Sequence, residues 1–161
     1  MSAQQREAID DSIANRESWE RAIMNAEDFN RNNIEEFRAN HGRLGGSFEG
    51  APMLLLHTVG VRSGQERVSP MMYLADDDRY LVFASAAGAD NNPAWYWNLR
   101  NHPDVSIEVG DEHLNVHAVE LTGAERDEKY AEQARRYPGF AEYQRKTTRT
   151  IPVIALHEGR A

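Results

Sequence analysis

The chain has 161 residues, the length of one ordinary domain, and its 26 acidic and 18 basic residues give a formal net charge of −8. This acidic balance argues against a protein that binds duplex nucleic acid, because such proteins carry basic surfaces. The chain has no cysteine, which excludes a disulfide scaffold and a thiolate metal site. No run reaches the ~20 apolar residues of a membrane span, and the polar start does not resemble a secretory signal. We therefore expect a cytoplasmic protein with a single domain over residues 1–161.

Residues 1–42 carry a helical pattern and precede a core that we expect over residues 43–161. Apolar residues such as Ile9, Ile13 and Phe37 recur at helical spacings on a polar background. We interpret this segment as a solvated helix with one face on the core. The alternative is a helix that covers a ligand or lies on a membrane surface, although its excess of acidic residues argues against anionic lipid.

From Pro52 onwards the pattern changes to β-strands. Short apolar or alternating runs predict strands at residues 53–59, 68–75, 80–85, 105–109, 113–121 and 151–157. Asp76-Asp77-Asp78 and Gly110-Asp111 fit hairpin turns. Three adjacent carboxylates at a turn point in different directions, so we expect no metal there. Pro152 predicts that the last strand starts at a sheet edge.

Two helices interrupt the predicted strands. Asn92-Pro93 combines an N-cap residue with a proline at the first helical position, which opens a helix over residues 94–101. Thr122 and Glu125 have the spacing of a capping box and open a helix that continues to about Tyr137. Pro138-Gly139 then breaks this helix. About six short strands without regular βαβ alternation fit a small α+β barrel.

The histidines do not predict a metal centre. His113 and His117 are four residues apart, which would make a metal-binding pair on a helix. Their segment alternates like a strand, where four residues span roughly 13 Å at ~3.3 Å each. The two side chains therefore cannot share one ion. The sequence also lacks a Gly-x-Ser-x-Gly elbow and the glycine-rich fingerprints of phosphate and dinucleotide sites.

Two segments have the composition of a binding site. Gly60 and Gly64 bracket a turn whose backbone amides can converge on an anion, and Arg62 and Arg67 add positive charge. A basic hairpin turn without a ligand is the alternative. Residues 83–93 are small and polar and lead into a helix N-terminus, which would let a flat anionic ligand approach the backbone.

Six motifs lie in a fixed order along residues 40–157. They are Leu44-Gly45-Gly46-Ser47-Phe48, the Thr-x-Gly-x-x-Ser-Gly-x-x-Arg run at 58–67, Pro70, Asn92-Pro93-Ala94-Trp95-Tyr96-x-Asn98-Leu99, His102-Pro103, and Tyr137-Pro138 through Tyr143-Gln144 to Ile151-Pro152-Val153. In this order they resemble the deazaflavin-dependent nitroreductase family. The resemblance implies a split β-barrel of mostly antiparallel strands, coenzyme F420 as the cofactor, and reduction of quinones and nitro compounds.

The resemblance also implies which residues form the site. Arg62 and Arg67 would hold the phosphate and the oligoglutamate tail of the cofactor. The residues that would line the cofactor are Val61, Arg62, Ser63, Gly64, Arg67, Val68, Ser69, Pro70, Met71, Met72, Phe83, Ala84, Ser85, Ala86, Ala94, Trp95, Tyr96, Trp97 and Asn98. Three aromatic residues would close the substrate side, namely Tyr137, Phe140 and Tyr143.

The chain departs from the family pattern at four positions. The family often has a basic residue in place of Val61, and its characterised nitroreductases have lysine in place of Ala86, tyrosine in place of Phe140 and an aromatic residue in place of Met72. The cofactor motif is mostly kept and the substrate wall is altered. We therefore expect hydride transfer from reduced F420 to a flat, electron-poor small molecule such as a quinone, with weak or absent reduction of nitroimidazoles.

Two other functions are compatible with the sequence. One is an FMN-dependent oxidoreductase with the same barrel, which would need Arg62 and Arg67 less because FMN lacks the oligoglutamate. The other is a non-catalytic protein that binds a lipid or a cofactor. The apolar Met71-Met72 pair and the N-terminal helix would favour this function. We expect a monomer or a homodimer.

Overall fold

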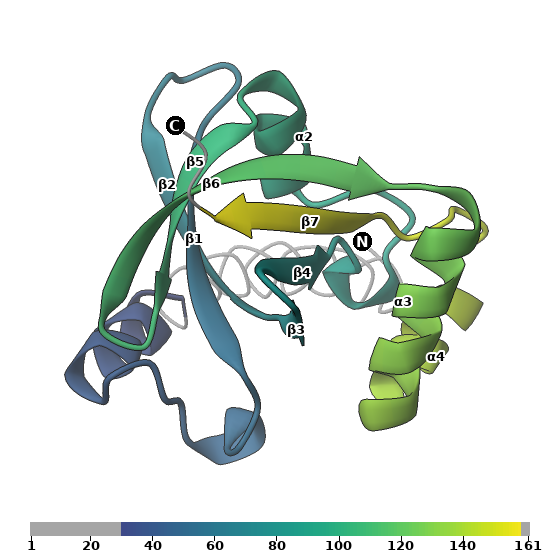
Figure 1. The fold of residues 1–161 in the computed structure, drawn as a ribbon, viewed down its shortest axis with the longest axis horizontal. Helices are drawn as coiled ribbons and strands as arrows, with labels where there is room; N and C mark the ends of the chain where they lie inside the picture. The colour runs from purple at the N-terminus through teal and green to yellow at the C-terminus, as the bar shows by residue number, and fades with distance from the viewer. Residues whose placement is uncertain (1–29, 159–161) are drawn as a thin grey trace, which may run out of the picture.

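The computed structural model describes residues 30–158 and shows one strongly curled sheet with helices around it (Figure 1). The strands are β1 (Met53–Val59), β2 (Glu66–Met72), β3 (Leu74–Asp76), β4 (Arg79–Phe83), β5 (Asp104–Val109), β6 (Glu112–Leu121) and β7 (Val153–Glu158). Their order in the sheet is β2-β1-β5-β6-β7-β4-β3, and every neighbouring pair is antiparallel. The predicted α+β barrel is confirmed, with seven strands instead of about six.

The connection at Tyr73 explains both the extra strand and the curl of the sheet. The predicted strand at 68–75 divides at this residue, because the chain leaves β1 as its partner and pairs with β4 instead. β2 and β3 are the two edges of the sheet, yet only Tyr73 joins them. The sheet must therefore curl until its edges meet, and β2 also approaches β4.

The helices lie at the ends and on the outside of the sheet (Figure 1). Residues 30–39 are helical, and the expected helix over residues 1–29 lies outside the described residues. The other helical elements are η1 (Gly46–Phe48), η2 (Ala86–Gly88), α2 (Ala94–Asn101), α3 (Gly123–Arg136) and α4 (Gly139–Arg145). The predicted break at Pro138-Gly139 is confirmed. Within residues 30–158, none of the helices combines the length and the apolar character that crossing a membrane requires.

Three local predictions were wrong. Asn92 does not cap α2, because Pro93 occupies the cap position and the Asn92 side chain accepts a hydrogen bond from Arg149 Nη1 at 2.7 Å. Thr122 caps α3 without a side-chain hydrogen bond, and Glu125 pairs with Arg79 instead. β7 is a central strand, between β6 and β4. Pro152 is tolerated there because it precedes the first residue of the ladder and removes no donor from it.

The core forms on both faces of the sheet, which explains the continuous apolar run of β1. Leu54 and Leu56 are fully buried with Tyr96 and Leu99 of α2 on one face, whereas Leu55 is fully buried against Phe37 on the other. A further cluster joins the outer side of β4 and β7 to α3 and α4, through Phe83, Leu121, Tyr130, Ile151 and Val153. α2 is thereby fixed beside the turn between β1 and β2.

Candidate functional site

A groove of about 1020 Å³ lies between the β1–β2 turn, the start of α2 and the helical residues 30–38. It brings together many of the predicted cofactor residues from two segments that are far apart in the sequence. Those that line it are Val61, Arg62, Ser63, Arg67, Val68, Ser69, Ala94, Trp95, Trp97 and Asn98. Val61 and Trp97 leave about half of their surface exposed, 50% and 48%, so the groove has an apolar wall open to a ligand.

Local hydrogen bonds fix the shape of the β1–β2 turn. The Gly60 N–H donates to Gln65 O at 2.8 Å, and the Gly64 N–H donates to Gly60 O at 2.9 Å. Gly64 has a φ of +67°, which a residue without a side chain adopts at no steric cost. The Ser63 hydroxyl accepts the Gln65 N–H at 3.1 Å and so belongs to the turn itself.

Asn98 ties this turn to α2. Its Oδ1 accepts the Val61 N–H at 3.2 Å, and its Nδ2 donates to Thr58 Oγ1 at 3.1 Å. Asn98 and Thr58 are both buried, and a buried amide is costly unless its polar atoms are paired. Asn98 therefore lines the groove and also holds the turn and the helix in a fixed relation.

The groove keeps two arginines without a carboxylate partner among residues 30–158, namely Arg62 and Arg67. Both are exposed. The neighbouring acidic residue Glu66 pairs with a histidine instead, because its Oε1 lies 2.7 Å from His57 Nδ1. Two exposed guanidinium groups beside an apolar wall suit an anionic ligand with a flat apolar part.

Glu108 organises the charges next to the groove. Its carboxylate accepts hydrogen bonds from Arg38 Nε at 3.1 Å and Arg38 Nη2 at 2.8 Å, and it lies 2.6 Å from His57 Nε2. The hydrogen bonds from Arg38, aided by His57, lower the pKa of Glu108 from 4.5 to about 2, although its burial acts in the opposite direction. The ligand atoms of His57, Glu108 and His113 lie within 4.8 Å of one another, close enough for a metal ion. Because Arg38 already neutralises this carboxylate, we interpret the group as an ion-pair network.

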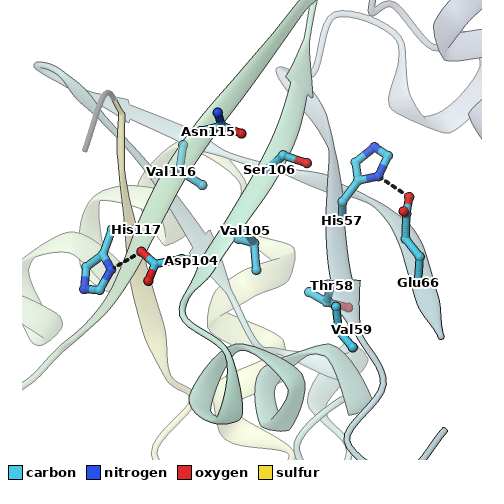
Figure 2. A pocket seen from close by; sticks show the side chains of 10 residues that line it. All are labelled: His57, Thr58, Val59, Glu66, Asp104, Val105, Ser106, Asn115, Val116 and His117. Carbon is cyan, nitrogen blue, oxygen red and sulfur yellow. Dashed lines mark hydrogen bonds and ion pairs between the residues drawn. The ribbon is translucent and has the colours of Figure 1, made fainter. Parts of the chain in front are cut away.

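A second hollow, of about 660 Å³, lies against β1, β5 and β6 (Figure 2). Figure 2 shows a histidine–carboxylate pair on either side of it, His57 with Glu66 and His117 with Asp104, both at 2.7 Å. The carboxylates at both sides make it unsuitable for a polyanion. His113 and His117 lie on the same strand and pair with different carboxylates, Glu108 and Asp104.

The remaining predicted cofactor residues lie in three places, namely β2 with its turn, the end of β4, and α2. Pro70, Met71 and Met72 are half-buried on β2, and Gly64 is exposed at the turn. Phe83 and Ala84 are buried at the end of β4, followed by the half-buried Ser85 and the exposed Ala86. Tyr96 lies on α2 but does not line the groove: it is 4% exposed, and its hydroxyl donates to Glu120 at 2.6 Å.

The three predicted substrate-side residues lie at α3 and α4. The Phe140 ring packs edge-on against Phe83 at 5.6 Å and Tyr143 at 5.4 Å, while Tyr137 immediately follows α3. α4 contacts η2, which begins at Ala86. Tyr130 of α3 stabilises α4, because its hydroxyl donates a hydrogen bond to Phe140 O at 2.6 Å. Burial raises the pKa of Tyr130 to about 12, so this donor stays protonated at neutral pH.

Comparison with known proteins identifies relatives along most of the chain. Residues 29–158 match the family model described as F420H(2)-dependent quinone reductase. An F420H(2)-dependent quinone reductase of Mycobacterium tuberculosis is 39% identical over 129 residues, which covers 74% of this chain and 83% of that protein. A solved F420-H2 dependent reductase is 38% identical with a TM-score of 0.61, covering 66% of this chain and 94% of that chain. A solved domain-swapped dimer is 32% identical with a TM-score of 0.62, covering 87% of this chain and 98% of that chain.

Proposed function

The chain belongs to the F420H(2)-dependent quinone reductase family, and we propose that it transfers a hydride from reduced F420 to a quinone or a similar flat acceptor. The observation that carries this proposal is the pair of arginines on the groove, Arg62 and Arg67, which have no carboxylate partner within the described part of the chain. Because the chain has a net charge of −8, a polyanion needs a local group of cations to bind. The arginines fit the phosphate and carboxylates of the F420 tail, because guanidinium groups bind such anions with two hydrogen bonds.

The ring of the cofactor fits the neighbouring surfaces. Trp97 and Val61 offer an exposed apolar wall in the groove, and small residues at the end of β4 allow a flat ring to approach the backbone. β2 connects the two places, since it starts at the groove and approaches β4. Bound F420 would supply the hydride from C5 of its deazaflavin ring.

The protein's own part is to orient the two reactants and to exclude water. Phe140 offers an apolar surface to the acceptor, whereas Tyr137 and Tyr143 each carry a hydroxyl. Among residues 30–158, neither of these hydroxyls is engaged in a hydrogen bond. Each is therefore free to donate to an acceptor oxygen, and either it or solvent delivers the proton that completes the reduction.

Parallel titrations of the purified protein with F420 and with FMN test this proposal. We expect tighter binding of F420, because FMN lacks the oligoglutamate that Arg62 and Arg67 would hold. Oxidation of reduced F420 in the presence of a quinone separates an enzyme from a non-catalytic binding protein. Tighter binding of FMN, or F420 binding without turnover of any quinone, would contradict the proposal.

Three finer expectations stay predictions. The preference for quinones over nitroimidazoles depends on the altered wall at Phe140. The choice between monomer and homodimer is testable by light scattering, and the related domain-swapped dimer favours the homodimer. The cytoplasmic location is testable by cell fractionation.

A further inference from the structure

The loop between β4 and α2 adopts a conformation that its sequence disfavours. Ala86 and Ala87 have φ values of +45° and +55°, and Gly88 follows with +83°. Residues with a Cβ rarely occupy this left-handed region, and two in succession need external support. The loop begins at Ala84 and Ser85, which the proposed function places beneath the cofactor ring. Its shape therefore bears directly on how the cofactor would sit.

One guanidinium supplies this support. Arg149 Nε donates to Ala89 O at 2.8 Å, Nη1 donates to Ala84 O at 3.1 Å, and Nη2 donates to Ser85 O at 2.9 Å. Nη1 also donates to Asn92 Oδ1 at 2.7 Å. Arg149 thus holds both ends of the segment that contains the two strained alanines. Among residues 30–158 it has no carboxylate partner, so its donors serve the loop.

Arg149 is itself held by α4 and α3. Its carbonyl accepts a hydrogen bond from Gln144 Nε2 at 2.7 Å, and Arg126 Nη2 donates to Gln144 Oε1 at 2.7 Å. The loop also touches α4 directly. A Cβ added to Gly88 would lie 2.9 Å from Tyr143 O, so only glycine permits this approach. The loop between β4 and α2 is consequently connected to α4, the helix that carries Phe140 and Tyr143.

We propose that Arg149 is a positioning residue that holds the Ala84–Asn92 loop in its strained form and fixes its distance from α4. This inference rests on the proposed function, because the loop is taken to support the F420 ring and α4 to carry the acceptor side. Loss of the guanidinium would let the loop relax, which would weaken F420 binding and misplace the cofactor relative to the acceptor.

The test compares Arg149→Lys and Arg149→Met with a matched control, Arg79→Met. Arg79 is a similarly buried arginine with hydrogen bonds to Asp76 and Glu125 at the β3–β4 turn, away from the loop. Hydrogen–deuterium exchange of the ligand-free proteins should show faster exchange over residues 84–92 in the Arg149 variants alone. F420 affinity should fall at least about tenfold in Arg149→Lys, with a lower kcat at saturating F420 and an unchanged affinity in Arg79→Met.

A second substitution separates positioning from general destabilisation. Glycine tolerates a positive φ, so Ala87→Gly should recover part of the F420 affinity in the Arg149→Lys background and change the wild type little. Equal exchange and equal F420 affinity in the Arg149 and Arg79 variants would overturn the inference, as would the absence of recovery. A wild-type protein that binds no F420 would overturn the proposed function instead, while the exchange experiment would still decide whether Arg149 holds the loop.

Discussion

Replacing Glu108 with glutamine should remove a pH-dependent part of the folding free energy. The pKa of this carboxyl falls from 4.5 to about 2 in the folded protein, chiefly because Arg38 donates two hydrogen bonds to it. A difference of this size corresponds to about 3 kcal/mol of stability for the ionised form. Glu108 itself is only 8% exposed, but Arg38 is 51% exposed, so solvent screening makes this an upper bound.

The sign of the effect follows from the lowered pKa. The folded protein keeps Glu108 ionised where the unfolded chain would protonate it, so the stabilisation is fully present above about pH 4.5. It is lost as the pH falls towards 2, where the folded protein also takes up the proton. His57 and His113 face the same carboxylate, and their protonated forms would strengthen this pairing.

Urea unfolding at several pH values between 7 and 2.5 measures this contribution. The free energy of unfolding of the wild type should fall more steeply below pH 4.5 than that of Glu108→Gln, by up to about 3 kcal/mol. Glu112→Gln is a suitable control, because Glu112 is exposed at the start of β6 and should keep the wild-type slope. Parallel curves for wild type and Glu108→Gln would refute the assignment of a strong ion pair to Glu108.

Three further changes test other parts of the structure. Arg67→Ala should weaken F420 binding at least about tenfold at low salt and less at high salt. Arg135→Ala, on α3, should leave F420 affinity unchanged, and equal affinities of the two variants would contradict the assignment of the cofactor tail to Arg67. Phe140→Tyr should raise nitroimidazole reduction roughly two- to twelvefold by adding one hydrogen-bond donor, as measured by F420 oxidation with each acceptor. Gln133 is fully buried and its amide has no partner among residues 30–158, so Gln133→Met should raise the free energy of unfolding by about 1–3 kcal/mol in urea titrations. A loss of stability would show that the amide is satisfied.

The parts of the fold that the sequence predicted are those that local chemistry determines. The helix at 94–101 was predicted with its observed bounds, because the Asn92-Pro93 signal for a helix start acts within a few residues. The division at Tyr73 could not be predicted, since the residues on either side of it have the same strand-like pattern. Only the choice of partner, β1 for one side and β4 for the other, separates β2 from β3.

The same distinction holds for the candidate site. The turn at 60–65 was predictable because Gly60, Gly64 and the two arginines lie close together in the sequence. Asn98 was expected to contact the cofactor. Its hydrogen bond with the Val61 N–H was not predictable, because the two residues belong to separate elements and no sequence pattern links them. Arg149 was missed for the same reason. It lies in a polar stretch between α4 and β7, and the carbonyls that it binds are on a loop before α2.

The net charge of the chain does not predict the local charge of the groove. An acidic protein would be expected to repel a polyanionic cofactor, and Glu66 does lie on the groove. The fold resolves this conflict through His57, which contacts Glu66 on one side and Glu108 on the other. Glu108 in turn accepts hydrogen bonds from Arg38, so the two carboxylates that face His57 are engaged by residues other than Arg62 and Arg67. The local positive charge therefore depends on pairings between β1, β2 and β5 that only the folded sheet creates. It follows that His57→Ala, which touches no groove arginine, would free Glu66 to compete with an anionic ligand for Arg67.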